Sequence, residues 1–540
     1  MHIKALVKDH IQKYAPHIAF QMRSNSGYRR LTYAQARDAV KALAAQLVSA
    51  GIKKGDRVAI LSENRPEWSI TYLAITSLSA VAVPIDIMLH RKEIEPLLMD
   101  CEAKAVILSE RAREQAGPGL AKIEINIEDV DFLTPPASDE VFSKFEANDE
   151  DLAAIIYTSG TTGRSKGVML THSNIMSNVA AIASVHRVGV GDNFLSVLPL
   201  HHTFECTVGM LAPLYVGATI TYADQLKSHA LIANMQETGV TLMCGVPLLY
   251  QLFYDGILRE VEAKGPAVKK VFAVLMKLAK LIPSPGARRK LFPMIHKKLG
   301  GKINFWVSGG APIDPEVIRG FELFGLRIIQ GYGLTETSPI LTSNTMEANR
   351  IGSVGRPLPG VEMKVSKEGE ILARGPNIMK GYYKRPDLTA EVIRDGWFYT
   401  GDIGRLDKDG FYYITGRSKD VIVTGSGKNV YPDELEFRLK KIKGVSAVCV
   451  VGSRVKDGVR AGSEEVWAVV QPDYEYYEKT MKIKDRKEVE LSLVSRIMTV
   501  NEELADFKRI SNVVIREEDF PKTTTRKIKK FHVKKEMGLV

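Results

Sequence analysis

The segment Tyr157–His172 gathers the residue types that could hold a chain of phosphate groups. It reads YTSGTTGRSKGVMLTH, and ten consecutive positions, 158–167, contain five Ser or Thr hydroxyls, three glycines and Lys166. Glycine permits turns with positive φ and close approach of the backbone, so N–H groups and hydroxyls can form a concave anion site to which lysine adds a charge. Because a strand-like run, Ala153–Tyr157, leads into it, the segment predicts a phosphate-binding loop.

Other templates fit this segment less well. The P-loop template requires Gly where this chain has Ser165, and Ser or Thr where it has Gly167. The dinucleotide template GxGxxG is met neither here nor at Gly331–Glu336 or Gly425–Val430. The segment Gly163–Gly167 does match GxSxG, the nucleophile elbow of α/β-hydrolases. This leaves an esterase using Ser165 as an alternative, although an elbow joins a strand to a helix and the predicted strand ends earlier.

Two further glycine-rich motifs follow predicted strands. SGGAP (308–312) comes after Ile303–Val307, and QGYGLTETSP (330–339) comes after Arg327–Ile329. Ligands of open α/β sheets bind outside the carboxyl ends of strands, which is where these two turns would lie. Within the second motif, Tyr332 offers a flat face for a purine, Thr335 can donate to phosphate, and Glu336 is a hard oxygen ligand suited to Mg²⁺.

Taken in order, these motifs resemble the signatures of the adenylate-forming superfamily, which includes acyl- and aryl-CoA synthetases, luciferases and peptide-synthetase adenylation domains. The likeness extends over nearly the whole chain and is greatest to long-chain fatty acid–CoA ligases. It implies the use of ATP, Mg²⁺ and CoA, with Glu336 and Thr158 at the metal and Lys166 and Thr335 at the phosphates. It assigns the nucleotide to Thr158, Ser159, Gly160, Thr161, Thr162, Gly163, Lys166, Gly310, Ala311, Pro312, Gln330, Gly331, Tyr332, Gly333 and Thr335.

Three later motifs extend the resemblance toward the end of the chain. In YTGDIG (399–404) the family's aspartate, here Asp402, binds the ribose hydroxyls together with Arg417. In GRSKDVIVTGSGKNV (416–430), Lys419 matches the residue about which the C-terminal part pivots, and the resemblance also assigns it to the nucleotide. In the same motif the CoA route is assigned to Gly425, Ser426 and Gly427.

The motif FPKTTTRKIKKF (520–531) resembles the family's catalytic-lysine motif and places that lysine at Lys527. A lysine that reaches an α-phosphate can stabilise charge that develops on the transferred group. The neighbouring lysines make an ordinary basic tail an alternative, and Arg526 stands where the family usually has glycine.

The acid substrate is predicted from apolar segments. LPLHHTFE (198–205) matches a family motif bordering the acyl pocket, and His202 is its best-matching histidine. Val246, in the apolar run 240–253, and Gly309 complete the predicted pocket. The insertion-like stretch 257–300 resembles long-chain synthetases, and this resemblance favours medium- to long-chain fatty acids. An aryl acid, or release of acyl-AMP to a carrier protein, stays open. In the family, fatty acyl-AMP ligases carry an extra insertion in the large domain. No such insertion is seen between Glu336 and Asp402, which are only 66 positions apart (402 − 336), and the resemblance therefore favours CoA.

The elements that must position these residues alternate between strand and helix. Leu31–Ala50 predicts a helix that buries Ala36, Ala39, Val40, Leu43, Ala44 and Leu47 on one face; Arg57–Leu61, Ala105–Leu108 and Phe194–Leu198 predict strands. Such alternation predicts an α/β fold with parallel sheets, here a large domain (1–416) of two αβα subdomains. Short alternating runs after residue 350, such as Val361–Val365 and Glu370–Ala373, predict a β-barrel-like subdomain. Residues 417–540 predict a small mobile α+β domain beyond a hinge at 416–420.

Composition and charge exclude several classes. The 540 residues are 45% hydrophobic and 25% charged, which excludes a mainly disordered chain. The net charge of +11 favours anionic partners without choosing among nucleotides, CoA, acidic lipid surfaces and nucleic acid. Given the resemblance, we expect no nucleic acid as a partner. The four cysteines match no zinc template and are expected to be buried thiols. With no secretory signal or membrane span predicted, we expect a cytoplasmic protein, with peripheral contact at the inner face of the membrane as a further possibility.

The segment Val268–Ile282 predicts a basic amphipathic helix. At 3.6 residues per turn, Lys269, Lys270, Lys277 and Lys280 fall opposite Val271, Leu275, Leu278 and Ile282. Such a helix can lie on an anionic membrane or pack its apolar face on its own domain. The sequence leaves both possibilities open. A non-catalytic paralogue, which would lack Lys527, Glu336 or Lys166, is disfavoured because all three are present.

Overall fold

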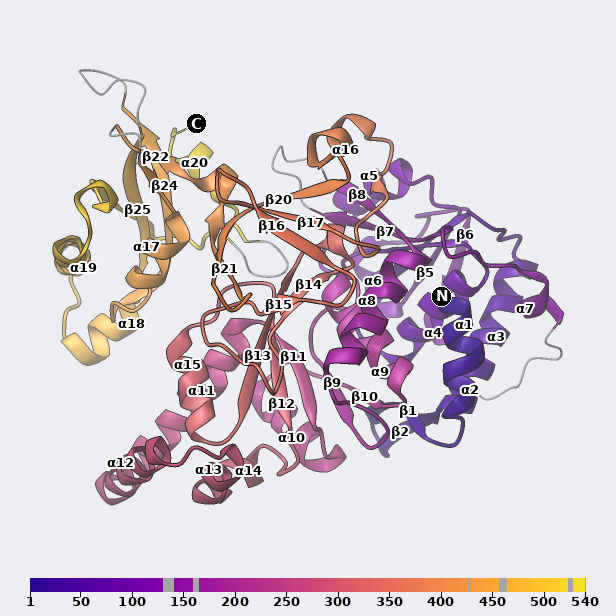
Figure 1. Cartoon of the computed structure of the whole chain (residues 1–540), viewed down its shortest axis with the longest axis horizontal. Helices are drawn as coiled ribbons and strands as arrows, with labels where there is room; N and C mark the ends of the chain where they lie inside the picture. Colours follow the sequence, from indigo (N-terminus) through magenta and orange to yellow (C-terminus); the bar gives the residue numbers. More distant parts are fainter. Residues whose placement is uncertain (130–139, 159–164, 426–427, 456–463, 523–527, 540) are drawn as a thin grey trace. The chain divides into compact units, whose positions relative to one another are not determined.

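The computed structural model describes residues 1–129, 140–158, 165–425, 428–455, 464–522 and 528–539 (Figure 1). The chain forms two compact units. Unit 1 comprises Met1–Met363, Ala373–Phe398 and Lys408–Tyr412, and unit 2 comprises Lys364–Leu372, Tyr399–Asp407 and Tyr413–Val540. Each unit is described by itself.

A nine-stranded sheet is the larger sheet of unit 1. Its order is β15 (Arg356–Pro357), β14 (Ile340–Ser343), β13 (Arg327–Gly333), β12 (Phe305–Ser308), β11 (Leu242–Gly245), β9 (Asn193–Ser196), β10 (Thr219–Tyr222), β1 (Ile18–Ser24) and β2 (Gly27–Thr32). Strands β13 to β1 along this order pair in parallel, and β14, β15 and β2 are antiparallel. Six carboxyl ends therefore lie at one edge of the sheet.

Unit 1 contains a second sheet, which has seven strands. Its order is β18 (Gly381–Tyr382), β8 (Lys166–Thr171), β7 (Leu152–Thr158), β4 (Val81–Pro84), β3 (Arg57–Leu61), β5 (Ala105–Leu108) and β6 (Ile123–Asn126). Strands β7 to β6 are parallel, whereas β8 and β18 are antiparallel additions. The predicted strands Arg57–Leu61 and Ala105–Leu108 are confirmed at the same bounds.

The helices near the chain start show how local sequence fixes the elements. Thr32 caps α3 (Tyr33–Ser49) in a reciprocal pair with Gln35, so the helix begins two residues after the predicted Leu31. All six apolar residues of the predicted face are buried. The other helices of this half are α1 (Ile3–Ala5), α2 (Ile11–Lys13), α4 (Pro66–Ser77), α5 (Arg91–Asp100), α6 (Glu110–Ala116), α7 (Glu140–Lys144), α8 (His172–Val185), α9 (Ala212–Val216) and α10 (Ser228–Thr238).

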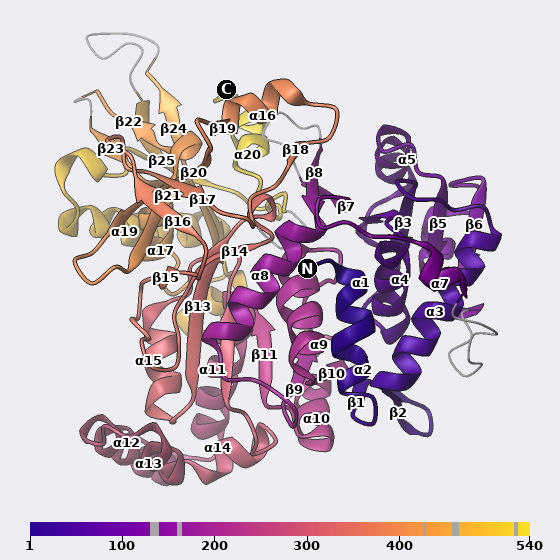
Figure 2. The same ribbon diagram turned by 45° about the vertical axis from the view of Figure 1, so that its right-hand side comes forward.

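A second helical group packs beside β11, β12 and β13 (Figure 2). It consists of α11 (Pro247–Ala263), α12 (Pro266–Leu281), α13 (Pro285–Leu291), α14 (Pro293–Lys298) and α15 (Pro315–Leu323), each starting with proline at its first turn. Aromatic rings form the centre of its core, with Trp306 packed on Tyr250, Phe253 and Phe321. The predicted basic helix is α12. Among the described residues, none of the helices is both long and apolar enough for a membrane crossing.

The β region after residue 350 is a five-stranded sheet. It contains β16 (Glu362–Val365), β17 (Glu370–Arg374), β20 (Trp397–Leu406) and β19 (Ile393–Arg394), with β21 (Tyr412–Arg417) paired to β20. Helix α16 (Pro386–Val392) precedes β19. The chain passes between the two units within β16, β17, β20 and β21.

Unit 2 has its own core on a small mixed sheet. The sheet is β24 (Val445–Arg454), β25 (Glu464–Pro472) and β26 (Asn512–Ile515), and a separate hairpin pairs β22 (Ile422–Val423) with β23 (Asn429–Val430). Helices α17 (Pro432–Leu439), α18 (Tyr474–Tyr476), α19 (Arg486–Val500) and α20 (Lys530–Glu536) complete it. The predicted α/β class with a C-terminal α+β part is confirmed. The four cysteines are buried and free, as expected.

Candidate active site

The predicted phosphate loop connects two antiparallel strands. β7 ends at Thr158 and β8 begins at Lys166, and these two residues are directly opposite in the ladder. Gly167 is required next to them, because a Cβ there would lie 2.8 Å from the Ile155 side chain. A nucleophile elbow needs a helix after the serine. The esterase interpretation of Ser165 is therefore wrong, since a strand follows it.

Strand β18 brings a tyrosine to the end of this hairpin. Tyr382 lies with its ring 5.0 Å from the Lys166 Nζ, and its hydroxyl donates to Glu336 Oε1 at 2.8 Å. Three segments that are distant in the chain thus meet, with a cation and a carboxylate on either side of one phenol. Tyr382 was not predicted from the sequence, because the YY pair at 382–383 matches no phosphate or metal pattern.

The turn that carries Glu336 is held by buried amides. Glu336 lies in the one-turn 3-10 helix η4 (Thr335–Thr337), after β13. Asn178 of α8 donates to the Ile340 carbonyl (2.7 Å) and accepts from the Ile340 N–H (3.1 Å). Asn377 donates to the carbonyls of Thr337 (2.9 Å) and Ile340 (3.2 Å). Both amides are buried, so the turn is fixed on two sides.

The two glycine-rich motifs meet at the edge of the larger sheet. Ser308 ends β12 and lies opposite Gln330 in parallel β13. Ser308 Oγ and Gln330 Oε1 are buried and have no hydrogen-bond partner among the described residues. Buried polar atoms without partners are uncommon and fit a site that a ligand completes.

The second motif differs from its predicted geometry in one respect. Residues Gln330–Gly333 continue strand β13, and Gly331, Tyr332 and Gly333 pair with β14, whereas the sequence predicted a turn after Ile329. The strand extends because β14 returns antiparallel beside it. A Cβ on Gly333 would lie 1.7 Å from the Pro339 carbonyl oxygen, so only glycine fits this close approach. Thr335 follows in η4, and Gly310, Ala311 and Pro312 form the exposed turn after β12.

The predicted acyl-pocket residues lie at the same edge. Gly309 follows β12, Val246 follows β11 and His202 follows β9, and these strands are neighbours. A Cβ on Gly309 would lie 3.0 Å from the Phe204 ring, and one on Gly310 would lie 3.9 Å from Val246. The structure therefore places Phe204 beside Gly309, and Val246 beside Gly310. Phe204 belongs to the LPLHHTFE motif but was not singled out from the sequence.

The Leu198–Glu205 loop is braced by Asn64 from the other sheet. The Asn64 amide donates to the Leu198 carbonyl at 2.6 Å and accepts from the Leu200 N–H at 2.9 Å. His201 is buried, its Nε2 3.5 Å from Asp86, and burial keeps its pKa well below the usual value. His202 is half-buried and its ring contacts that of His201. Of the two side chains, His202 is the more exposed to solvent.

The predicted ribose residues are paired within unit 2. Arg417 Nε lies 2.8 Å from Asp402 Oδ1, and the Asp402 side chain is buried. Strands β20 and β21 are hydrogen-bonded neighbours, which places the two side chains together. Lys419 lies in the 3-10 helix η5 (Ser418–Asp420), and Gly425 lies in an exposed turn.

Several predicted residues lie outside the described part of the chain. These are Ser159, Gly160, Thr161, Thr162, Gly163, Ser426, Gly427 and Lys527. Two pairs of residues that border these segments are described. Thr158 pairs with Lys166, and Lys522 pairs with Ile528 in an isolated antiparallel bridge.

The residues present fit a magnesium ion bound through a substrate. Mg²⁺ in nucleotide sites commonly takes one or two carboxylates together with phosphates and waters. Glu336 Oε1 accepts from Tyr382, and Oε2 has no hydrogen bond with any described residue. No group of three or more His, Cys, Asp or Glu that could cage a metal occurs among the described residues. Glu336, a single carboxylate near the β7–β8 hairpin, therefore fits a Mg²⁺ ion whose other ligands are phosphate oxygens of the substrate and water.

The chain is similar in sequence to known enzymes. The family model for AMP-binding enzymes matches residues 7–383. The chain is 32% identical over 484 residues to the long-chain-fatty-acid–CoA ligase FadD15 of Mycobacterium bovis, covering 83% of this chain and 80% of that protein. It is also 32% identical over 444 residues to a feruloyl-CoA synthase of Amycolatopsis sp, covering 79% and 81%.

A solved structure shares the fold along the whole chain. The ATP-bound crystal structure of MatB from Rhodopseudomonas palustris aligns with a TM-score of 0.76 at 27% identity. The alignment covers 99% of each chain.

Proposed function

The chain belongs to the AMP-binding enzyme family, and from this premise we propose that it is an ATP-dependent acyl-CoA synthetase. The enzyme activates a medium- to long-chain fatty acid as acyl-AMP and transfers the acyl group to CoA, releasing AMP and pyrophosphate. The observation that carries the proposal is the meeting of Lys166, Tyr382 and Glu336 beside a hydroxyl-rich loop.

In the first half-reaction the carboxylate of the acid attacks the α-phosphorus of ATP, and the bond to pyrophosphate breaks. Lys166 and the hydroxyls of the loop hold the leaving pyrophosphate. Glu336 and Thr158 would hold Mg²⁺, which supplies positive charge beside the triphosphate when bound. Lys527 stabilises charge on the α-phosphate. This is catalysis by positioning and electrostatics.

In the second half-reaction the CoA thiol attacks the acyl carbon and AMP leaves. We propose that residues 417–540 turn about Lys419 between the two steps, withdrawing Lys527 and opening the route past Gly425, Ser426 and Gly427. The nucleophile is the CoA sulfur. The buried cysteines of the chain are not needed, and burial raises the pKa of the Cys206 and Cys449 thiols to about 12.

The acid is proposed from the lining at the strand ends. Phe204, Val246 and Gly309 give an apolar surface beside the half-buried His202. A relative named long-chain-fatty-acid–CoA ligase supports an aliphatic acid, and the feruloyl-CoA synthase keeps an aryl acid as the second candidate. A panel of fatty and cinnamic-type acids, compared by kcat/KM, separates the two.

We also propose that the protein is cytoplasmic and reaches a membrane only by peripheral contact at its inner face. A fatty acid partitions into lipid, so an enzyme that collects it at a lipid surface meets a concentrated substrate.

The test follows both half-reactions separately. We expect pyrophosphate release that depends on the acid, and thioester formation only when CoA is present. Lys527→Ala should reduce acyl-AMP formation by about a hundredfold or more, because charge stabilisation in a transition state contributes this much. It should leave thioester formation from supplied acyl-AMP nearly unchanged. Equal loss of both halves would contradict the pivot, and pyrophosphate release without thioester would show a different acceptor.

A further inference from the structure

Helix α12 has two apolar faces, of which only one is used by the fold. Phe272, Leu275, Met276 and Ala279 pack against the aromatic core beneath the helix. A second row, Val271, Val274, Leu278 and Leu281, is exposed, with relative accessibilities of 60%, 55%, 45% and 80%. A surface helix of a globular protein needs a single apolar stripe. Packing within the fold therefore does not explain why the second row, called here the apolar row, is apolar.

The spacing of the apolar row is helical. Its members are separated by three, four and three positions, which places them within one side of an α-helix. Lys270 and Lys277, seven positions apart, border the apolar row. Lys280 lies nearly one turn beyond Lys277 along the helix. The predicted apolar face is thus divided by the structure: Leu275 packs inward, whereas Val271 and Leu278 face outward.

The charge around the row has one sign. From Lys264 to Lys302 the chain has eleven Lys and Arg residues and no Asp or Glu. Lys264, Lys269 and Lys298 are paired with Glu260 or Glu262 of α11. Lys270, Lys277 and Lys280, which border the apolar row, have no ion pair with any described residue.

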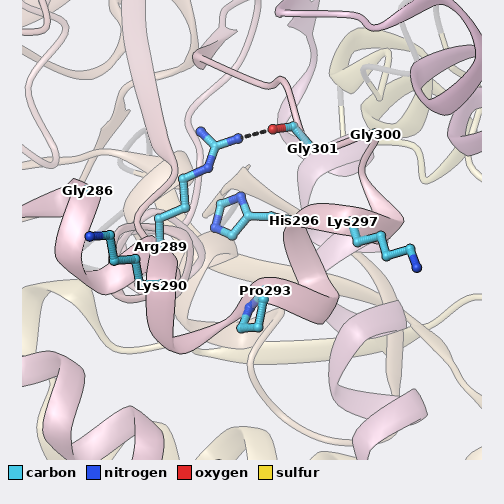
Figure 3. A pocket seen from close by; sticks show the side chains of 8 residues that line it. All are labelled: Gly286, Arg289, Lys290, Pro293, His296, Lys297, Gly300 and Gly301. Atoms are coloured by element: carbon cyan, nitrogen blue, oxygen red, sulfur yellow. Dashed lines mark hydrogen bonds between the residues drawn. The ribbon is translucent and has the colours of Figure 1, made fainter.

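The cationic side chains of α13 and α14 fall into two groups: some are hydrogen-bonded to backbone carbonyls, and others are exposed to solvent. Arg288 and Arg289 donate to backbone carbonyls, including those of Ile282, Ile303 and Gly301, and so fasten α13 to the unit. The shallow pocket between α13 and α14 shows the difference, since Arg289 points to Gly301 while Lys290 and Lys297 extend to opposite sides (Figure 3). The pocket holds no convergent set of donors, so we assign no ligand to it.

We propose that α12 docks this unit on an anionic lipid bilayer, with the apolar row entering the interface and Lys270, Lys277 and Lys280 at the headgroups. Apolar side chains bordered by lysines are the arrangement that binds such surfaces. Helices α12 and α13 lie at an outer end of unit 1 in both ribbon views, away from the β7–β8 hairpin (Figures 1 and 2). This inference rests on the proposed function for its biological purpose, but its test uses no substrate.

The experiment is co-sedimentation of the full-length protein with vesicles of phosphatidylcholine containing phosphatidylserine, compared with phosphatidylcholine alone. We expect binding to the anionic vesicles that weakens as salt is raised from 0.1 to 0.5 M, because salt screens exposed charges. Substituting Gln for Lys270, Lys277 and Lys280 together should weaken binding by about a hundredfold, at about fivefold per lysine near an anionic surface. Val271→Ser with Leu278→Ser should weaken it by at least about tenfold.

The matched control lies on α19, where Leu491→Ser and Lys487→Gln also remove an exposed leucine and an exposed lysine. These should leave vesicle binding unchanged. No binding by the parent protein, equal loss in the control, or self-association that the α12 variants abolish would each overturn the proposal. All variants should keep pyrophosphate release with a soluble acid, so failure of docking and failure of the proposed function are distinguishable.

Discussion

At the scale of single residues, the phenol of Tyr382 connects the two charges of the candidate site. Its hydroxyl donates to Glu336 and its ring lies beside the Lys166 ammonium. A cation over a ring and a donor on a carboxylate both fix side chains that would otherwise rotate. Tyr382 is therefore a positioning residue for the carboxylate assigned to Mg²⁺.

Tyr382→Phe should lower acyl-AMP formation by about tenfold, since one hydrogen bond contributes about 1–1.5 kcal/mol. The apparent affinity for Mg²⁺ should fall with it, because Glu336 is no longer oriented. Pyrophosphate exchange measured over a magnesium titration checks both. Tyr383→Phe is the control and should behave like the parent protein. An unchanged magnesium dependence in Tyr382→Phe would remove the positioning role.

Glu205 is a second residue with a measurable consequence. It is fully buried, and burial raises the pKa of its carboxyl group to about 8, although the neighbouring Ser196 hydroxyl acts in the opposite direction. The neighbouring Gly209 leaves room for it, because a Cβ there would lie 2.5 Å from the carboxyl carbon. The folded protein thus keeps a proton that the unfolded chain releases near its ordinary value of 4.5.

This pKa fixes the sign of a pH effect. Between pH 4.5 and 8 the folded state binds more protons at Glu205 than the unfolded state, so the free energy of unfolding falls as pH rises. Glu205→Gln should remove this slope, making the variant relatively more stable at pH 8 than at pH 5. Urea unfolding at several pH values measures it. Parallel stability curves for variant and parent would show that Glu205 is not protonated in the fold.

At the scale of elements, the turn after β13 depends on side chains from elsewhere. Asn178 on α8 makes two hydrogen bonds to Ile340, and Asn377 adds two more to the same turn. Glycines at 333 and 355 allow the backbones of β13 and β14 to approach their neighbours. Helix α8 and strand β14 therefore position Glu336 as much as its own motif does.

Asn178→Ala should destabilise the protein by about 2–4 kcal/mol, because two hydrogen bonds are lost and the Ile340 N–H stays buried without a partner. It should also reduce acyl-AMP formation, since the Glu336 turn is released. Ser184→Ala, at an exposed position of the same helix, should change stability by less than about 0.5 kcal/mol. Chemical unfolding and pyrophosphate exchange compare Asn178→Ala with Ser184→Ala. An Asn178→Ala protein that is inactive but as stable as the parent would contradict the expected loss of stability.

At the scale of the whole molecule, the two units have separate cores. Leu326 belongs to the aromatic core of unit 1, and Leu493 belongs to the core between α19 and β24–β25 of unit 2. Both are almost fully buried. Separate cores allow separate unfolding transitions in a chain of this size.

Leu493→Ala and Leu326→Ala are therefore a matched pair. Each should cost about 2–5 kcal/mol through lost burial and a cavity. In calorimetry, Leu493→Ala should lower one transition and Leu326→Ala another. A single transition shifted equally by both variants would show that the units unfold together.

Much of the outcome was available from the sequence alone. The family, the α/β class, the strands Arg57–Leu61 and Ala105–Leu108 and the buried face of α3 were predicted, because local periodicity and short motifs carry them. Glu336, Lys166, Val246 and Gly309 were also singled out by their motifs. Their roles in binding remain predictions that the experiments above test.

The tertiary structure decided what depends on contacts between distant segments. Tyr382, Asn178 and Asn64 carry no local pattern, and only sheet pairing and helix packing bring them to the site. Likewise, a helical-wheel projection of α12 could not predict that Leu275 is packed inside and Leu278 is exposed, because the core beneath the helix determines which face packs. Short-range patterns determine elements and motifs, whereas pairing across the chain determines which side chains meet.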